Sequence, residues 1–401
     1  MRILVFNYGS SSVRCSLVET DGARDVPASD GRLVASASVE RVGQPGAQLR
    51  DDFAGEARVR EVVAATHAEA IAHLHRLLRD TDLGEVAGIG HRVVHGGEQF
   101  REAVRIDDPV ERSIEALAAL APQHNPLSLA GIRAARASFP DTAHVAVFDT
   151  AFHHTLPPRA HVYPIPYELY ETERIRRYGF HGTSHRYAAE RAAELLGVPR
   201  DRFTGITCHL GNGASVTAVE AGCSVDTSMG LTPLEGLMMG TRSGDVDPGL
   251  LGHLAASRGA TPQEVVALLS EESGLLGVSG VSSDLRDVER AAETGNPRAR
   301  LALDIFAYRV RKYLGAYCAV LSRLDAIVFT GGMGENSAAL REDIVRGLQH
   351  LGIDLDPGLN AQCAGTEAVI SSPDAPVRIF VVPSREDRVI AREVTRLLGE
   401  A

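Results

Sequence analysis

Three glycine-rich segments have the composition of a phosphate-binding turn. Residues 7–12 read Asn-Tyr-Gly-Ser-Ser-Ser, residues 211–215 read Gly-Asn-Gly-Ala-Ser, and residues 331–336 read Gly-Gly-Met-Gly-Glu-Asn. Backbone N–H groups that point outward at such a turn can hold a phosphate, and serine hydroxyls add further donors. The third segment also precedes a predicted helix, whose N-terminus favours negative groups. Each segment alone could be an ordinary turn, but the three together favour nucleotide binding.

Two arginines stand among residues that would not solvate a charge. Arg92 lies in His-Arg-Val-Val-His-Gly-Gly (91–97), and Arg242 lies in Met-Gly-Thr-Arg-Ser-Gly-Asp (239–245). A guanidinium presents paired N–H donors that match carboxylate or phosphoryl oxygens. Most arginines of the chain are expected to be solvated surface charges, whereas an unpaired charge among glycine, histidine and apolar residues would be costly. We therefore expect these two to bind an anionic substrate.

Two carboxylates follow predicted strands. Asp149 ends the strand predicted at 144–148, and Glu386 comes after the strand predicted at 377–382. Functional side chains often occupy such positions in open α/β sheets. Oxygen ligands of this kind suit Mg²⁺, which takes only one or two carboxylates and keeps several waters. The alternatives are a turn or N-cap residue for Asp149 and a helix-dipole charge for Glu386.

The histidines do not form a convincing zinc site. His91 and His95, and His181 and His185, are four residues apart, but their segments are strand-like or contain glycine. A helical two-histidine face is therefore disfavoured. We interpret His181 as a donor to developing negative charge, while His124 could act similarly or orient a loop.

Composition excludes several classes of nucleotide-binding protein. The chain has 401 residues and a formal net charge of −11, which argues against a nucleic-acid partner. Its only lysine, Lys312, follows Arg311, so the GxxxxGK[ST] loop of P-loop proteins is absent. No GxGxxG follows a predicted strand either. Any phosphate chemistry must therefore use arginine, backbone amides and metal.

Cysteine usage and hydropathy indicate the compartment that we expect. The five cysteines contain no CxxC pair, which predicts reduced thiols in a cytoplasmic protein. The apolar run at 3–6 is too short for a signal peptide, and no run approaches the length of a membrane span. We expect no membrane partner.

The order of predicted elements indicates an α/β protein with a repeat. Strand, glycine–serine tip and returning strand occur at 3–18 and again at 205–219, which suggests a duplicated α/β domain. Prolines break the segment 151–178, which we interpret as the passage between two domains. Strands that alternate with helices predict mostly parallel sheets covered on both faces. The other predicted elements are strands at 86–94, 144–148, 326–329 and 377–382, and helices at 61–79, 114–121, from 337, and at 388–398.

At these residues the sequence closely resembles the acetate kinase family. Nine segments match it in the family's order: NYGSSS (7–12), HRVVHGG (91–97), APQHNP (121–126), FDTAFH (148–153), YGFHGTSH (178–185), HLGNG (209–213), DTSMGLTPLEGLMMGTRSGDVDPG (226–249), GVSGVSSDLRD (277–287) and FTGGMGEN (329–336).

The resemblance implies two duplicated actin-like, ribonuclease H-like domains with the active site in a cleft between them. It places an N-terminal domain at 1–150, joined by the C-terminal helix at about 387–401. A second domain at 151–386 would bind the nucleotide and form a homodimer. The implied reaction is ATP + acetate ⇌ ADP + acetyl phosphate.

The resemblance also implies a role for each matching residue. Asn7 and Glu386 would hold Mg²⁺, with Mn²⁺ as a substitute, and Arg92 would bind the acyl carboxylate and phosphate. Asp149 would be the essential acidic residue. His181 and Arg242 would stabilise the transferring phosphoryl group, with His124 nearby. Val94, Phe180 and Pro233 would line the acyl pocket, and ATP or ADP would contact Arg14, His209, Leu210, Gly211, Asn212, Gly213, Asp284, Leu285, Arg286, Gly332, Met333, Gly334, Glu335 and Asn336.

Three departures and three alternatives accompany this interpretation. Arg14 replaces the family's lysine, Gln123 replaces an apolar residue of the acyl pocket, and Arg385 replaces a small polar residue. Propionate or another short acid could replace acetate, because one methylene contributes only about 1–3 kcal/mol to discrimination. A sugar kinase on the same fold is a weaker alternative, and a non-catalytic actin-like nucleotide switch is a remote one. Because a carboxylate acceptor with a pKa of about 4–5 is already ionised at neutral pH, we expect Asp149 to organise Mg²⁺ or an arginine rather than to take a proton.

Overall fold

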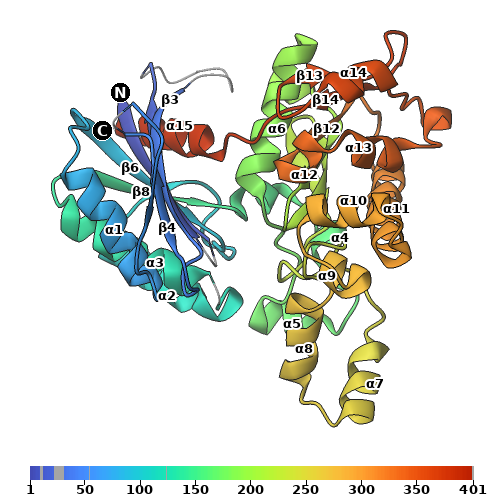
Figure 1. Ribbon diagram of the computed structural model, residues 1–401, viewed down its shortest axis with the longest axis horizontal. Helices are drawn as coiled ribbons and strands as arrows, with labels where there is room; N and C mark the ends of the chain where they lie inside the picture. The colour runs from blue at the N-terminus through green and yellow to red at the C-terminus, as the bar shows by residue number, and fades with distance from the viewer. Residues whose placement is uncertain (10–11, 22–30, 54, 123, 400–401) are drawn as a thin grey trace. The chain divides into compact units, whose positions relative to one another are not determined.

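The computed structural model describes residues 1–9, 12–21, 31–53, 55–122 and 124–399 (Figure 1). The chain divides into two compact units. The first comprises Met1–His154 and Arg385–Ala401, and the second comprises Thr155–Ser384. None of the described helices is long and apolar enough to cross a membrane.

The first unit is built on an eight-stranded mixed sheet with the order β5-β4-β3-β2-β1-β6-β8-β7. Its centre is parallel: β1 pairs with β6, and β6 pairs with β8. The strands β2 to β5 extend from β1 as an antiparallel meander, and β7 is antiparallel to β8. The strands are β1 (Arg2–Tyr8), β2 (Ser12–Glu19), β3 (Arg32–Glu40), β4 (Gln48–Asp51), β5 (Arg58–Glu61), β6 (Val86–Val93), β7 (Val104–Arg105) and β8 (Ala143–Phe148).

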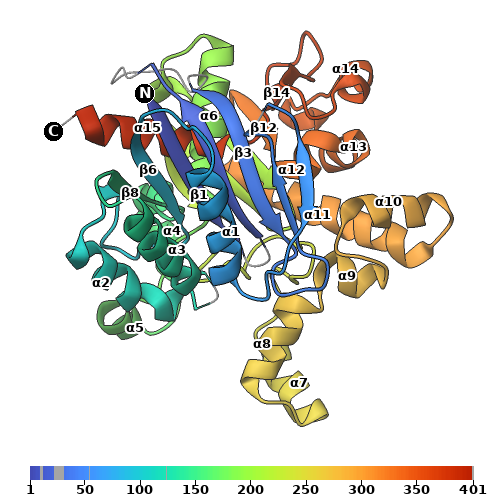
Figure 2. The ribbon, with the colours of Figure 1, turned by 60° about the vertical axis from the view of Figure 1, so that its left-hand side comes forward.

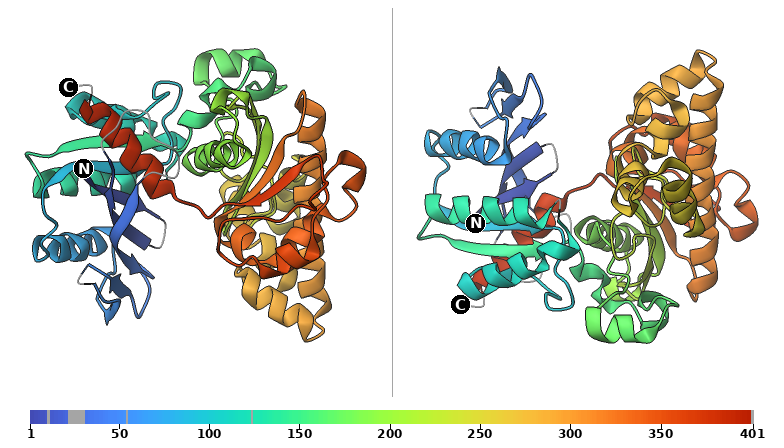
Figure 3. Two further views of the ribbon diagram at one scale, coloured as in Figure 1. Left: turned by 90° about the horizontal axis from the view of Figure 1, so that it is seen from above. Right: turned by 90° about the horizontal axis from the view of Figure 1, so that it is seen from below.

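Helices cover both faces of this sheet because β1 alternates its side chains between them. Leu4 and Phe6 pack against α1 (His67–Arg79) and α3 (Asn125–Ser138), whereas Ile3 and Val5 pack against α15 (Glu386–Gly399). Figure 3 shows α15 lying on the sheet. This helix approaches β6 so closely that a Cβ on Gly90 would lie 2.4 Å from Ile390 Cγ2. The remaining helices of this unit are α2 (Asp108–Ala116) and the 3₁₀ turn η1 (Leu117–Leu120), while η2 (Ala151–Thr155) runs into the second unit.

The second unit repeats the same sheet plan. Its order is β11-β10-β9-β12-β14-β13, with β9 antiparallel to β10 and parallel to β12, and β12 parallel to β14. The series β11-β10-β9-β12-β14 therefore has the order and directions of β3-β2-β1-β6-β8, which confirms the α/β fold class. The prediction of mostly parallel sheets is wrong, because most neighbouring strands of both described sheets are antiparallel. The strands are β9 (Gly205–Leu210), β10 (Ala214–Glu220), β11 (Cys223–Thr227), β12 (Ala326–Thr330), β13 (Ala368–Val369) and β14 (Arg378–Val381).

The helices of the second unit include two that extend away from its sheet, α7 (Gly249–Arg258) and α8 (Pro262–Glu271) (Figure 2). The long helix α11 (Pro297–Val320) packs against α9, α10 and α13. The others are α4 (Pro158–His161), α5 (Tyr167–Glu173), α6 (Gly182–Leu196), η3 (Arg200–Arg202), α9 (Gly274–Ser279), α10 (Leu285–Glu293), α12 (Gly331–Asn336), α13 (Ala338–Val345), η4 (Gln349–Leu351) and α14 (Pro357–Gln362).

Three predicted elements are wrong in detail. The helix predicted at 61–79 begins only at His67, because residues 58–61 pair with β4 and the Thr66 hydroxyl caps the helix by accepting from the Glu69 N–H. The helix predicted at 114–121 is the end of α2 followed by a 3₁₀ turn. The glycine-rich segment 331–336 is not an open turn but the short helix α12, which starts directly after β12.

Candidate active site

The first unit gathers three polar side chains around one guanidinium. Arg92 Nε donates to Asp149 Oδ1 over 2.9 Å, and Arg92 Nη2 donates to Asp149 Oδ2 over 2.5 Å. Arg92 Nη1 donates to Asn7 Oδ1 over 3.0 Å, and Glu386 Oε2 lies 3.6 Å from Arg92 Nε. The structure thus brings together the four residues of this unit for which metal binding, acyl binding or an essential carboxylate was predicted.

The fold explains why these residues meet although they are far apart in the sequence. Asn7, Arg92 and Asp149 lie at the carboxyl ends of the neighbouring parallel strands β1, β6 and β8, so all three reach the same edge of the sheet. Glu386 is the first residue of α15, and the close packing of α15 on β6 brings its N-terminal turn to that edge.

Charge compensation holds Arg92 in its cationic form. Burial alone would lower the pKa of its guanidinium, but the carboxylates of Asp149 and Glu386 outweigh burial and raise that pKa above its usual value. Asp149 is 1% exposed, so its two-point contact with Arg92 is shielded from water. This paired guanidinium is a rigid group for binding a carboxylate or phosphate.

The donor set of Asn7 and Glu386 fits Mg²⁺. Both side chains offer oxygen ligands, both lie beside the same guanidinium, and Mg²⁺ is bound through one or two carboxylates together with substrate phosphates. Across the part of the chain that the structure describes, no group of three or more His, Cys, Asp and Glu residues could hold a metal ion.

Other predicted residues of the first unit surround this cluster to different extents. Val94 is buried immediately after β6, and His124 precedes α3 as its N-cap residue. Arg14 stands opposite Asn7 in the β1–β2 pair, on the same face of the sheet, and is exposed. Gln123, Ser10 and Ser11 lie outside the described residues.

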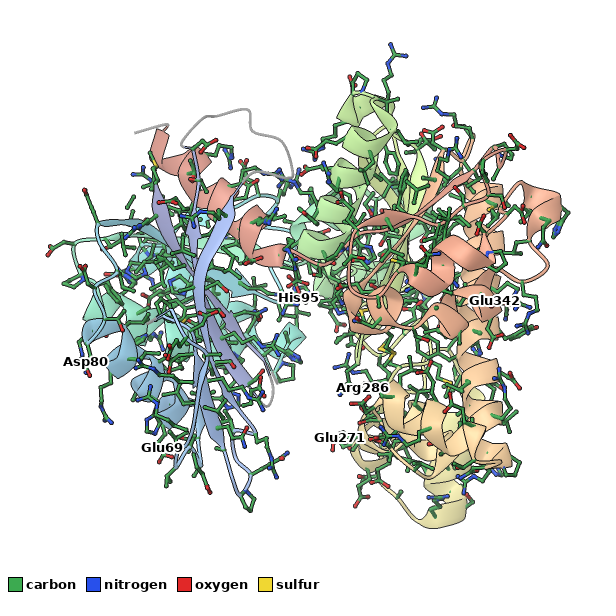
Figure 4. The ribbon with its side chains drawn as sticks, turned by 45° about the horizontal axis from the view of Figure 1, so that its top comes forward. Glu69, Asp80, His95, Glu271, Arg286 and Glu342 are labelled. Carbon is green, nitrogen blue, oxygen red and sulfur yellow. The ribbon has the colours of Figure 1, made fainter. Side chains whose placement is uncertain are left out.

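The loop after β6 is fixed by an amide clamp. The His95 N–H donates to Asn125 Oδ1 over 3.1 Å, and Asn125 Nδ2 donates to the His95 carbonyl over 3.0 Å. His95, labelled in Figure 4, is fully buried. Burial lowers its pKa to about 4, so His95 is neutral at pH 7 and serves the structure of this loop.

The second unit holds His181 in a strained and well-supported position. His181 is the N-cap of α6 and has a φ of 58°, a left-handed conformation that is uncommon for residues other than glycine. Its Nδ1 lies 2.8 Å from Ser215 Oγ, which also lies 2.7 Å from His185 Nε2. His185 Nδ1 in turn lies 2.7 Å from Thr207 Oγ1. This series of hydrogen bonds fixes the His181 ring, and its Nε2 faces Gly213.

Arg242 faces the same space from a different loop. A Cβ built on Gly213 would lie 3.3 Å from His181 Nε2 and 3.6 Å from Arg242 Nη1, so only a glycine leaves this space open. Arg242 Nη1 donates to the Pro233 carbonyl over 3.3 Å and contacts Met239 Sδ at 3.8 Å. Among the described residues no carboxylate is within ion-pair distance of Arg242. Burial without an opposing charge lowers the pKa of its guanidinium from the usual value.

A pocket of about 680 Å³ adjoins the second tip. It lies between the tip at 211–212, the start of α10 and the helix α12, and its size suits a nucleoside. Eight of the predicted nucleotide contacts line it: Gly211, Asn212, Asp284, Leu285, Arg286, Gly332, Met333 and Asn336.

Some predicted contacts have other partners in this structure. Arg286, labelled in Figure 4, is largely exposed and pairs with Asp284, Nη2 to Oδ2 over 2.5 Å, which lowers the pKa of Asp284. His209 Nδ1 lies 2.8 Å from Ser184 Oγ, and its ring stacks on His181 at 4.3 Å. Glu335 Oε1 accepts the Ser384 N–H over 2.9 Å. Leu210, Gly213 and Gly334 lie outside the pocket lining, while Phe180 is buried and Pro233 supplies the carbonyl that binds Arg242.

Sequence reasoning missed several residues of these sites. Ser215 supports His181, but it was noted only as part of a turn. Ser283, Glu289 and Ser337 also line the pocket. Glu289 is one helical turn beyond Leu285, so the i+4 spacing within the predicted nucleotide segment could have identified it.

Comparisons with known proteins find the same family over nearly the full length of the chain. Residues 2–392 match the model of the acetokinase family. Acetate kinase of Clostridium botulinum (strain Kyoto / Type A2) is 49% identical over 406 residues, which is 100% of both chains, and acetate kinase 2 of Listeria monocytogenes (serotype 4b) is 48% identical over 98% of both. The crystal structure of Porphyromonas gingivalis acetate kinase matches with a TM-score of 0.90, 43% identity and 99% coverage of both chains. A propionate kinase structure from Francisella tularensis also matches with a TM-score of 0.90, at 39% identity and 98% coverage of both.

Proposed function

The chain belongs to the acetokinase family, and from this premise we propose that its two side-chain clusters serve one reaction. The enzyme is an ATP:acetate phosphotransferase that reversibly transfers a phosphoryl group from ATP to acetate, giving ADP and acetyl phosphate. The match to acetate kinases over the whole chain supports this activity. We propose direct in-line transfer, with the two units supplying different parts of the catalytic machinery.

Arg92 binds the acceptor carboxylate in this proposal. Its guanidinium already lies between Asp149 and Asn7, and it is held rigid by the two-point contact with Asp149. The acceptor needs no general base because acetate is ionised at neutral pH. Asp149 therefore orients Arg92, and Val94, Phe180 and Pro233 line the acyl pocket.

Arg242 and His181 stabilise the transferring phosphoryl group. Such a group spreads negative charge over three oxygens, so catalysis depends mainly on positioning and countercharge. The single observation that supports this role best is that both side chains face the space above Gly213, while no described carboxylate neutralises Arg242. His124 assists near the acceptor.

The nucleotide occupies the pocket beside the second tip, with its phosphates toward His209–Gly213. Asn7 and Glu386 hold Mg²⁺, or Mn²⁺ in its place, and Arg14 binds a phosphate next to them. The metal neutralises the charge of the ATP phosphates when bound. The donor chemistry of the two side chains supports this assignment.

We further propose that the enzyme acts in the cytoplasm as a homodimer formed through the second unit. Its product supplies acetyl groups for acetyl-CoA biosynthesis. Reduced cysteines support the compartment, because the five cysteines are free thiols.

A hydroxylamine trap tests the activity directly. Acyl phosphates react with hydroxylamine to give hydroxamates, so acetate, ATP and Mg²⁺ with the enzyme should give acetohydroxamate in proportion to ADP. ADP formed without hydroxamate, at a rate independent of acetate, would indicate the nucleotide switch instead. Comparison of kcat/KM for acetate, propionate and butyrate decides the acceptor. A higher value for propionate would favour the activity named for the Francisella structure.

A further inference from the structure

The largest fully buried side chain of the described protein is a cation, Arg341 of α13. It donates five hydrogen bonds. Nε donates to Asn360 Oδ1 over 2.8 Å, Nη1 to the carbonyls of Gly334 and Glu335 over 2.9 and 3.0 Å, and Nη2 to the carbonyls of Asn360 and Cys363 over 3.1 and 2.8 Å. The five donors of the guanidinium therefore all have partners.

The partners of Arg341 are unusual because all of them are uncharged. A buried charge normally has a charged partner, since its desolvation is costly. No carboxylate of the described residues lies within ion-pair distance of Arg341, and burial lowers the pKa of its guanidinium. Two of its five bonds go to carbonyls at the end of α12, where the helix dipole is negative. The charge is thus stabilised by the backbone that it holds in place.

The helix held in this way is a wall of the candidate nucleotide pocket. Gly332, Met333 and Asn336 of α12 line that pocket. A helix of six residues with three glycines is not stable by itself, so its position depends on external contacts. On the other side, Ser337 Oγ donates to Glu289 Oε1 over 2.5 Å, which joins this wall to the pocket wall formed by α10.

We propose that Arg341 is a positioning residue for the nucleotide, which it does not touch. It fastens the carboxyl end of α12 to the segment 360–363 and so keeps the pocket wall in the shape that ATP and ADP require. The inference rests on the proposed nucleotide site. Loss of Arg341 should therefore weaken nucleotide binding and leave acceptor binding intact.

The chain offers a matched control for a test. Arg311 of α11 binds the end of another helix in the same manner: its Nε donates to the Ile344 carbonyl over 3.0 Å and its Nη2 to the Asp343 carbonyl, both at the end of α13. Arg311 does not line the nucleotide pocket. Arg341→Lys and Arg311→Lys each keep the charge and remove the planar donor fork.

The experiment measures ATP and ADP binding to the free enzyme by calorimetry, together with KM for acetate and the thermal midpoint. We expect Arg341→Lys to raise both nucleotide Kd values about tenfold while KM for acetate stays within about twofold. Arg311→Lys should lower the thermal midpoint to a comparable extent without changing nucleotide Kd. Unchanged nucleotide affinity in a folded Arg341→Lys variant, or an equal loss in Arg311→Lys, would overturn the proposal.

A second variant covers the case in which Arg341→Lys does not fold. Asn360→Ala removes the acceptor of Arg341 Nε and keeps the other four bonds, so it should weaken nucleotide binding about threefold. No change in Kd for this variant would contradict the proposal. ATP binding by the wild-type protein distinguishes failure of the proposed function from failure of the role of Arg341. If the wild type does not bind ATP at all, the proposed function fails. If the wild type binds ATP and the variants bind it equally well, only the role of Arg341 is refuted.

Discussion

The two units share one sheet plan but hold their largely buried arginines, Arg92 and Arg242, in opposite electrostatic environments. In the first unit, Arg92 is surrounded by Asp149, Glu386 and Asn7. In the second unit, Arg242 contacts a carbonyl and a thioether, and His181 is held by a neutral hydroxyl. The largely buried arginine of the first unit is therefore paired with carboxylates, whereas that of the second unit has no such partner among the described residues.

We propose that this difference separates the binding role of the first unit from the catalytic role of the second. A guanidinium that is already paired with carboxylates gains little binding free energy from a further negative charge. It is rigid, however, and can orient an acceptor carboxylate beside a metal. A buried guanidinium without a counterion is costly in the free protein and favours whatever negative charge enters its space. We therefore assign most of the transition-state stabilisation to the second unit and most of the acceptor orientation to the first.

The largest expected effect is the loss of Arg242. Arg242→Ala should lower kcat by about 10³-fold or more, because the transferring group loses its uncompensated countercharge. Arg309→Ala is a matched control, since Arg309 Nη1 donates to the Asp245 carbonyl in the same loop, and it should keep kcat within about threefold. Steady-state kinetics with circular dichroism checks the result. If both variants lose activity equally, Arg242 serves only to hold the loop.

The next largest effect comes from removing a counter-charge in the first unit, so that Arg92 resembles Arg242 of the second unit. Asp149→Asn removes the charge that neutralises Arg92, and it should lower kcat about 10²-fold through misorientation of the acceptor. Because no base is required, the residual activity should keep the pH profile of the wild type between about pH 6 and 8. If the wild type shows an ionisation in that range in kcat against pH and the variant has lost it, Asp149 takes a proton.

The smallest effect concerns stability in acid and belongs to the first unit. His75 of α1 is buried, and burial lowers its pKa to about 4 from the usual value of 6.5. The unfolded chain therefore binds a proton first, so the contribution of this residue is intact above pH 6.5 and is lost as pH falls toward 4. His75→Phe removes this dependence. When the pH is lowered from about 7.5 to 4.5, the free energy of unfolding should fall in both proteins. The fall should be about 1–3 kcal/mol smaller for His75→Phe than for the wild type, as measured by urea titrations. Equal losses would mean that other groups account for the acid sensitivity.

Much of the fold and part of the site could be predicted from the sequence. The strand, glycine–serine tip and returning strand at 3–18 recur at 205–219, and this recurrence indicated the duplicated sheet. Strand ends also identified Arg92 and Asp149, because the carboxyl edge of a parallel sheet is where such side chains gather.

The sequence could not supply the contacts that depend on packing. The pairing of Arg92 with Asp149 joins residues on different strands, so it requires the strand order. Residues 331–336 have the composition of a loop, yet they are helical because Arg341 and the end of β12 hold them. Ser215 resembled any turn serine until β10 placed it between His181 and His185.

The most direct test of the central claim is the affinity of a transition-state mimic, ADP with aluminium fluoride, Mg²⁺ and acetate. The wild type should bind the planar fluoride far more tightly than Arg242→Ala, by about 10³-fold, while the two proteins differ less than about threefold in affinity for ADP alone. Equal tightening of the mimic in both proteins would contradict the assignment of transition-state stabilisation to the uncompensated charge of the second unit.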